Sequence, residues 1–219
     1  MTLYSRIVKN NFYIKSKKCH IFCIIGYMKS LSLARPHAIM MVGIPGSGKT
    51  HFAKKFSDTF NAPFINAEEI GTECGSEEIG QSVAGLFVAE LAKTGQTFVY
   101  EGMTASRSDR ADFNKWARSR GYHPMLVWVQ TDQPTAQDRT RRARGIDRHG
   151  YAALTKTFSP PHPSETPVVI SGKHTYATQA KVVLNHLAKA RKETAAIVPE
   201  RPVAPAAPAP RPSRSIRIE

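Results

Sequence analysis

Residues 43–50 carry the pattern Gly-x-x-x-x-Gly-Lys-Thr, a complete phosphate-binding loop of the Walker A type. The glycines allow the backbone to turn so that successive N–H groups face phosphate oxygens. Lys49 brings a positive charge to the β- and γ-phosphates, and the Thr50 hydroxyl is suited to Mg²⁺. The residues predicted to bind ATP are Gly43, Ile44, Pro45, Gly46, Ser47, Gly48, Lys49 and Thr50, with His51 directly behind them.

The residues around this loop supply the strand and the helix that the motif requires. Residues 38–42 form a short apolar run, which is typical of a buried parallel strand. After the loop, Phe52, Ala53 and Phe56 share one face of a predicted helix, and lysines occupy the other. We expect His51 at the surface of this helix rather than in a catalytic role. Strand, loop and helix together predict a nucleotide-binding site.

Apolar runs and helix signals alternate along the rest of the chain. We expect strands over residues 38–42, 63–66, 97–100, 125–129 and 168–170. We expect helices over residues 49–60, 76–93, 106–121 and 176–192, and one from Pro134 into an arginine cluster. This alternation predicts an α/β fold, a three-layer P-loop NTPase sandwich with a five-stranded, mainly parallel sheet.

Polar residues follow the predicted strands at their carboxyl ends. The first strand runs into the phosphate-binding loop, the second is followed by Glu68 and Glu69, and the third by Glu101. The arginine-rich segment 139–144 comes after the fourth strand. Ligands of parallel sheets bind at this edge, so we expect these groups to converge as phosphoryl transfer requires.

Four segments occur in the order found in a known family. They are residues 43–50, residues 65–70, residues 101–103 followed by 108–110, and residues 139–145. In these segments the chain resembles small P-loop kinases like the kinase half of phage polynucleotide kinase, which are often described as ATP-binding proteins of the AAA type. Zeta-toxin kinases are looser relatives. The resemblance covers roughly residues 36–192.

The resemblance implies a role for individual residues. Glu68 falls on the family's general base, and Glu101 on the acid that supports Mg²⁺. The basic lid that clamps the phosphates falls within residues 139–144. Of its arginines we favour Arg139 and Arg142, which lie three apart on one helix face. The predicted sets are Lys49, Glu68, Arg139 and Arg142 for catalysis, the loop with His51 and Arg144 for ATP, and Thr50 with Glu101 for Mg²⁺.

The chain also departs from the family pattern. Glu68 and Glu101 stand where Asp is usual, and Glu69 is the alternative general base. Gly71 occupies the position at which polynucleotide kinase has an arginine that holds the substrate's phosphate. This difference counts against phosphorylation of nucleic-acid 5′ ends.

The predicted activity is that of an ATP-dependent kinase, a transferase that moves the γ-phosphate of Mg-ATP to a hydroxyl. The acceptor is open between a small molecule and a nucleic-acid 5′-hydroxyl, and Arg107 and Arg110 are candidates for its binding side. The alternatives are a P-loop ATPase or nucleotide switch without an acceptor, and a nucleic-acid binder that uses the basic termini.

Charge and composition divide the chain into three parts. We expect a basic N-terminal extension over residues 1–35, a P-loop kinase-like domain over 36–194, and a disordered Pro/Ala/Arg tail over 195–219. Met28 is an alternative translation start. The formal charge is +14 for the whole chain but only +5 over 36–194, so the domain itself is mildly basic. Weak contact with nucleic acid is therefore expected, if at all, through the termini.

The apolar patch at residues 21–28 is too short to cross a bilayer and lacks a signal-peptide cleavage site. We therefore expect a cytoplasmic protein without a membrane segment. Cys19, His20 and Cys23 lack a fourth ligand for a zinc site. Together with Cys74, these cysteines are expected to be reduced thiols.

Overall fold

The computed structural model describes residue 33 and residues 35–197, and the side chains up to residue 189. The candidate start Met28, the Cys19–His20–Cys23 group and most of the two expected terminal extensions lie outside the described residues.

Five parallel strands form one sheet in the order β2-β3-β1-β4-β5. The strands are β1 (His37–Val42), β2 (Phe64–Asn66), β3 (Phe98–Glu101), β4 (His123–Gln130) and β5 (Val168–Ser171). The central strand β1 ends in the phosphate-binding loop, with β3 and β4 on either side. The predicted α/β sandwich with a five-stranded parallel sheet is confirmed.

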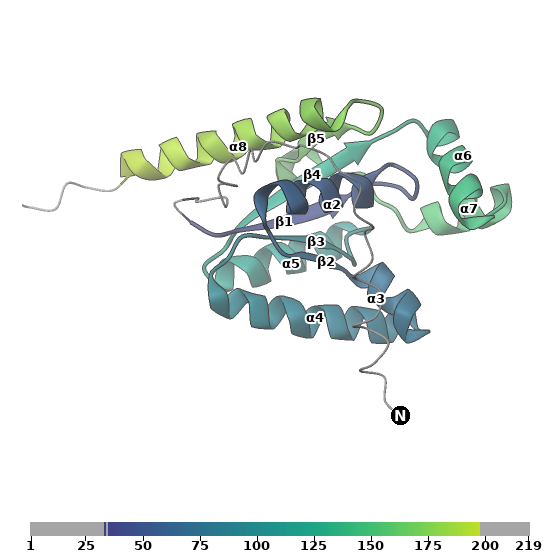
Figure 1. Ribbon diagram of the computed structural model, residues 1–219, viewed down its shortest axis with the longest axis horizontal. Helices are drawn as coiled ribbons and strands as arrows, with labels where there is room; N and C mark the ends of the chain where they lie inside the picture. The colour runs from purple at the N-terminus through teal and green to yellow at the C-terminus, as the bar shows by residue number, and fades with distance from the viewer. Residues whose placement is uncertain (1–32, 34, 198–219) are drawn as a thin grey trace, which may run out of the picture.

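Helices cover both faces of the sheet (Figure 1). One face is covered by α2 (Lys49–Phe60) and α8 (Tyr176–Ile197), and the other by α4 (Glu77–Thr94) and α5 (Arg107–Ser119). Three further helices gather at the carboxyl end of the sheet: α3 (Ala67–Cys74), α6 (Gln133–Arg144) and α7 (Arg148–Lys156). A single 3-10 turn, η1 (Pro163–Glu165), precedes β5.

Alternate residues of the central strand supply the two halves of the core. Ile39 and Met41 pack in the cluster that includes α2 and α8, whereas Ala38 packs in the cluster that includes α4 and α5. This is the period of two that a strand buried on both faces produces. Phe52 and Phe56 anchor α2 in the first cluster, and each burial stabilises the fold by about 1.5–3 kcal/mol.

Two helices of the carboxyl edge, α3 and α7, were not expected from the sequence. Asn66 begins α3 by accepting hydrogen bonds from the N–H groups of Glu68 and Glu69, at 3.1 and 3.3 Å. Asp147 begins α7 by accepting one from the N–H of Gly150, at 2.8 Å. Both are ordinary helix N-caps, which satisfy backbone donors that the first turn leaves free.

Two glycines allow α3 and α4 to pack at very short distance. A Cβ atom on Gly80 would lie 2.3 Å from the Cα of Gly71 and 2.7 Å from the carbonyl oxygen of Ala67. A Cβ atom on Gly71 would lie 3.2 Å from the Ser76 carbonyl oxygen, at the start of α4. Position 71 is therefore crowded by backbone, and a side chain there would require the start of α4 to shift by a few tenths of an ångström.

In the part of the chain that the structure covers, no helix combines the length and the apolar character that a membrane crossing needs.

Candidate functional site

A cavity of about 890 Å³ opens at the carboxyl edge of the sheet. Its lining includes Lys49, Thr50, Glu68, Glu101, Arg139 and Arg144, together with His51 and all three glycines of the loop. These residues come from α2, α3, β3 and α6, which are far apart in the sequence. The structure thus brings together most of the predicted site residues at the edge where they were expected.

The phosphate-binding loop is held between the end of β4 and α6. Gly46 has a positive φ of 76°, and a Cβ atom there would lie 2.1 Å from the Ala136 carbonyl oxygen and 2.5 Å from Thr140 Oγ1. Thr131, just after β4, donates a hydrogen bond from its hydroxyl to the Ser47 carbonyl at 3.0 Å. A side chain at Gly46 would therefore displace the loop, and only glycine fits this position.

The loop ends in the free N-terminus of α2. Gly48 is the N-cap residue, with φ 102°, and no side chain caps the helix. The first turn of α2 contains no acidic residue. Its unpaired N–H groups and the helix dipole therefore leave positive potential beside the cavity, which suits an anion such as phosphate.

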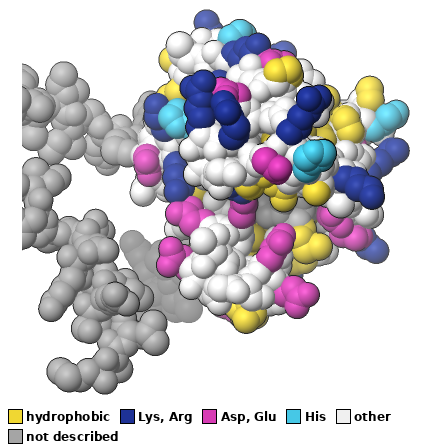
Figure 2. Space-filling view, turned by 90° about the vertical axis from the view of Figure 1, so that its right-hand side faces the viewer, with side chains coloured by type: hydrophobic (Ala, Val, Ile, Leu, Met, Phe, Trp, Pro, Cys, Tyr) yellow, Lys and Arg dark blue, Asp and Glu magenta, His cyan; other side chains and the backbone are white. Residues whose placement is uncertain are grey.

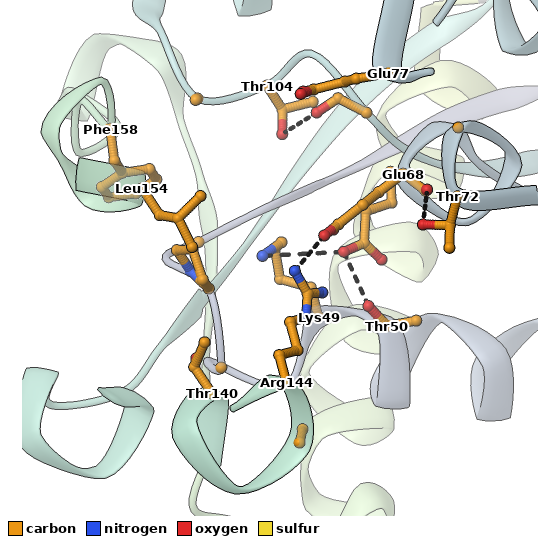
Figure 3. A pocket seen from close by; sticks show the side chains of 18 of the residues that line it. Lys49, Thr50, Glu68, Thr72, Glu77, Thr104, Thr140, Arg144, Leu154 and Phe158 are labelled. Atoms are coloured by element: carbon orange, nitrogen blue, oxygen red, sulfur yellow. Dashed lines mark hydrogen bonds and ion pairs between the residues drawn. The ribbon is translucent and has the colours of Figure 1, made fainter. Parts of the chain in front are cut away.

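Lys49, Thr50 and the buried Glu101 form a largely buried cluster at the floor of the cavity (Figure 3). Thr50 donates a hydrogen bond from Oγ1 to Glu101 Oε1 at 3.0 Å, and Lys49 Nζ lies 3.9 Å from the same oxygen. Lys49 also donates to the Ile44 carbonyl at 3.3 Å. The other carboxylate oxygen of Glu101, Oε2, is buried and has no hydrogen-bond partner among the described atoms.

Burial shifts the pKa values of Glu101 and Lys49 in the directions that favour their neutral forms. It raises the pKa of Glu101, while Lys49 and the Thr50 hydrogen bond act in the opposite direction. It lowers the pKa of Lys49, an effect that Glu101 opposes. Each charge is therefore incompletely compensated, and an anion beside Lys49 or a cation beside Glu101 would be favourable.

The cluster fits a Mg²⁺ ion that binds together with a nucleotide. A hydroxyl and a carboxylate are the oxygen ligands that Mg²⁺ accepts, and the unpaired Oε2 of Glu101 is available for one. Within the described residues, no group of three or more His, Cys, Asp or Glu side chains forms a complete protein cage. Mg²⁺ commonly binds to one or two protein groups plus substrate phosphates, so Thr50 and Glu101 suffice.

Glu68 and Arg144 form an ion pair across the cavity (Figure 3). Glu68 lies in the first turn of α3, and Arg144 is the last residue of α6. Both side chains are about half exposed. The alternative base Glu69 does not line the cavity; it forms an ion pair at 3.0 Å with Lys54 of α2.

The two arginines favoured from the sequence lie in different surroundings. Arg139 lines the cavity and donates from Nη1 to the Gly172 carbonyl at 3.1 Å. Arg142 does not line the cavity; its side chain is 76% exposed and forms an ion pair with Asp138 at 2.7 Å. Spacing on one helix face did not reveal which arginine reaches the site, because Asp138, one turn earlier, draws Arg142 away. Arg144 reaches the cavity instead.

Comparison with known proteins agrees with this geometry. A family model described as an AAA domain matches residues 39–161, more than half of the 219-residue chain. The chain belongs to this AAA domain family. The resemblance to AAA-type small P-loop kinases is thereby confirmed. None of the curated protein sequences matches the chain.

Solved structures share the fold of this AAA domain. A gluconokinase from Sinorhizobium meliloti 1021 has a TM-score of 0.56 and 16% identity, covering 74% of this chain and 98% of that one. The APS kinase CysC of Mycobacterium tuberculosis, in complex with AMPPNP and APS, has a TM-score of 0.55 and 15% identity, covering 71% and 98%. Kti12 of Chaetomium thermophilum, in complex with ADP-AlF3, has a TM-score of 0.55 and 13% identity, covering 70% and 98%. The fold is that of P-loop kinases.

Two arginines that were candidates for the acceptor side serve the architecture of this AAA domain instead. Arg110 is fully buried and donates from Nε and Nη2 to the Glu165 carboxylate, at 2.7 and 3.0 Å. Its Nη1 donates to the carbonyls of Thr104, Ala105 and Ser159. Arg107 donates to Ser164 Oγ at 3.2 Å, and neither arginine lines the cavity. Glu165 lies 55 residues from Arg110, so sequence spacing could not reveal the pair.

The far wall of the cavity includes a part, formed by α7, that the sequence did not reveal. It comes from α3, the start of α4, the segment after β3, and α7, including Thr72, Glu77, Leu154 and Phe158. In Figure 3, Glu77 and Thr104 lie on the opposite side of the cavity from Thr140 and Arg144. A signal for α7 was available, since Gly145 ends one helix and Asp147 caps the next.

Proposed function

We propose that this AAA domain protein is an ATP-dependent kinase that transfers the γ-phosphate of Mg-ATP to the hydroxyl of an acceptor. One observation carries the proposal. The cavity extends past the phosphate-binding loop to the wall formed by α3, α4 and α7, and Glu68 stands between the two parts. An acceptor needs space beside the phosphates, and this part of the cavity offers it.

The residues of the chain supply positioning and charge rather than covalent chemistry. Lys49 and the N–H groups of the loop hold the phosphate oxygens, and Arg139 and Arg144 meet charge that develops during transfer. Thr50 and Glu101 hold Mg²⁺, which neutralises phosphate charge when it is bound. Each of these groups lines the same cavity.

Glu68 acts as the general base in this scheme. It accepts the proton of the acceptor hydroxyl while that oxygen bonds to the γ-phosphorus and the bond between the γ-phosphorus and the departing ADP oxygen breaks. Its carboxylate is 51% exposed and lies at the boundary between the two parts of the cavity. The same exposure admits water, so hydrolysis of ATP without an acceptor is the second candidate function.

Proteins of the same fold include a gluconokinase and an APS kinase solved with AMPPNP and APS. They support phosphoryl transfer from ATP as the reaction class. Identities of 15–16% leave the acceptor of the present chain to be determined from its own site.

The decisive experiment follows the γ-phosphate. Protein is incubated with γ-labelled Mg-ATP and separate pools of small hydroxyl compounds, nucleosides and 5′-hydroxyl oligonucleotides. We expect label on an acceptor, and its loss in Lys49→Ala but not in the control Lys54→Ala, whose exposed side chain pairs with Glu69. Label that appears only in free phosphate would favour the ATPase, and unchanged transfer by Lys49→Ala would refute the scheme.

A further inference from the structure

The two parts of the cavity differ in charge. The basic side chains of its lining are Lys49, His51, Arg139 and Arg144, and all of them belong to α2 or α6. The far wall, built by α3, α4, the segment after β3 and α7, contributes no Lys, Arg or His to the lining within the described residues. We call this wall, with Glu68 and Glu77 as its exposed charged side chains, the acceptor wall.

Glu77 gives the acceptor wall an unbalanced negative charge. It is the first residue of α4 and is exposed, and no ion pair involves it among the described residues. Glu68 forms an ion pair with Arg144 and lies near enough to Lys49 to oppose the lowering of its pKa, and both basic groups face the phosphate side of the cavity. Once phosphates engage Arg144, both carboxylates face the acceptor without a basic partner.

The surface of the molecule shows the same division. Figure 2 views the end that carries α3, α6 and α7, with Lys and Arg mostly in the upper half of this face and acidic side chains mostly in the lower half. Two arginines near the acceptor wall have other partners, Arg110 with Glu165 and Arg107 with Ser164, and Arg148 at the start of α7 does not line the cavity. Gly71, packed against the start of α4, contributes no side chain to this part of the lining.

We propose that the acceptor is a hydroxyl compound that is uncharged or cationic, and that compounds carrying a phosphate or carboxylate near the reacting hydroxyl are excluded. This inference rests on the proposed kinase function and narrows its acceptor class. Neutral groups of the wall, among them Thr72, Ser76 and Gln81, supply hydrogen bonds to such a compound. Leu154 and Phe158 of the same cavity offer apolar contact to its carbon skeleton.

A charged thiol probe tests the potential of the wall without any knowledge of the acceptor. Thr72→Cys is made in a protein with Cys19→Ser, Cys23→Ser and Cys74→Ser, since Thr72 lines the cavity and is exposed. Modification rates are compared for a cationic and an anionic methanethiosulfonate reagent of similar size, with saturating Mg-ADP. The reference is Leu86→Cys in the same background, an exposed position of α4 outside the cavity lining whose sequence neighbours are uncharged.

We expect the cationic-to-anionic rate ratio at position 72 to exceed that at position 86 by about tenfold, because a cleft of one sign concentrates the opposite ion. Adding Glu77→Gln should bring the ratio down towards the reference. A ratio at or below the reference overturns the proposal, and a ratio that Glu77→Gln leaves unchanged overturns the role of Glu77. High salt should reduce the ratio in the parent variant.

A second experiment tests the proposal by phosphate transfer to matched acceptors. Transfer of labelled phosphate is measured for matched compounds that differ only in charge, such as a sugar, its amino sugar and its sugar acid, and a nucleoside with its monophosphate. The uncharged or cationic member should be preferred, and a faster anionic member overturns the proposal. Absence of any calorimetric heat with Mg-ATP would instead refute the proposed kinase function, so the two failures are distinguishable.

Discussion

Arg144 at the end of α6 forms an ion pair with Glu68 at the start of α3, and the pair crosses the cavity between the two parts of the site. Arg144 cannot satisfy Glu68 and a phosphate equally well. Arrival of the nucleotide should therefore draw the guanidinium toward the phosphates and free the carboxylate to accept a proton. In this arrangement one arginine couples nucleotide binding to the availability of the base.

A comparison of two arginines tests this coupling. Arg144→Ala should lower kcat by about 10²–10³-fold, the usual effect of removing a donor that stabilises transition-state charge. Arg142→Ala, which removes an exposed side chain paired with Asp138, should change kcat much less. Steady-state kinetics of the two variants decide the matter, and the reverse order of effects would reinstate the choice of Arg142 made from helix spacing.

Glu101 should control the dependence on Mg²⁺. Glu101→Gln keeps the size of the side chain and removes the charge that faces the buried cluster. We expect the affinity for Mg-ATP to fall about 10–100-fold, as for other groups that support a bound metal, while affinity for ATP in excess EDTA changes little. Titration calorimetry measures both, with Glu90→Gln as the control, since Glu90 is exposed and pairs with Lys93. Equal losses with and without Mg²⁺ would argue against a metal role.

The α3–α4 packing predicts opposite effects of two glycine substitutions in one helix. Gly80→Ala places a methyl group 2.3 Å from the Cα of Gly71 and should lower the free energy of unfolding by about 1–3 kcal/mol. Gly85→Ala points into open space and should raise it by about 0.5–1 kcal/mol, because alanine is the better helix former. Urea denaturation of both variants provides the measurement. Equal stabilities would show that the two helices are not packed this closely.

Stability should decrease in mild acid because of His37, at the start of β1. This residue is buried, its Nδ1–H donates to the Arg35 carbonyl at 2.9 Å, and its Nε2 is buried without a partner among the described atoms. Burial lowers the pKa of His37, and the neighbouring His123 adds to the effect. The unfolded chain therefore binds the proton more readily, so this contribution is present above the ordinary pKa of about 6.5 and is lost below it.

The test is the free energy of unfolding at pH values on both sides of that point. His37→Asn retains a donor for the Arg35 carbonyl and removes the titrating ring, so its stability should fall less on acidification. His149→Asn is the matched control because His149 is exposed. An undiminished acid sensitivity in His37→Asn would assign the effect to other groups.

Local signals were sufficient to predict much of the fold. The apolar run before the loop, the Gly-x-x-x-x-Gly-Lys-Thr pattern and the face of Phe52 and Phe56 act over a few residues, and the structure has a strand, a loop and a helix there. The carboxyl-edge rule for parallel sheets then predicted that Glu68 and Glu101 would lie near Lys49, and all three line one cavity. Their catalytic and metal-binding roles stay predictions.

What could not be predicted depends on contacts between distant residues. The ion pair of Arg110 with Glu165 joins residues 55 positions apart. Because of this pair, Arg110 stabilises the fold and does not bind the acceptor as the sequence had suggested. Arg142 pairs with its helix neighbour Asp138 instead of reaching the cavity. Counting which residues share a helix face does not reveal this preference. The glycine at position 71 was noticed as a departure, but its close packing against the start of α4 depends on tertiary structure.

The Arg110–Glu165 pair also limits where this molecule can move. Arg110 also donates to the Ser159 carbonyl and so links Ser159 to the loop after β3. Ser159 in turn donates its N–H to the Ala105 carbonyl at 2.9 Å. The segment that contains α6 and α7 leaves the sheet after β4, and the hydrogen bonds of Ser159 hold its other end. Any movement of α6 and α7 over a bound nucleotide is therefore confined to the segment between the end of β4 and Ser159. Protection of amides from deuterium exchange upon nucleotide binding should end at these two points.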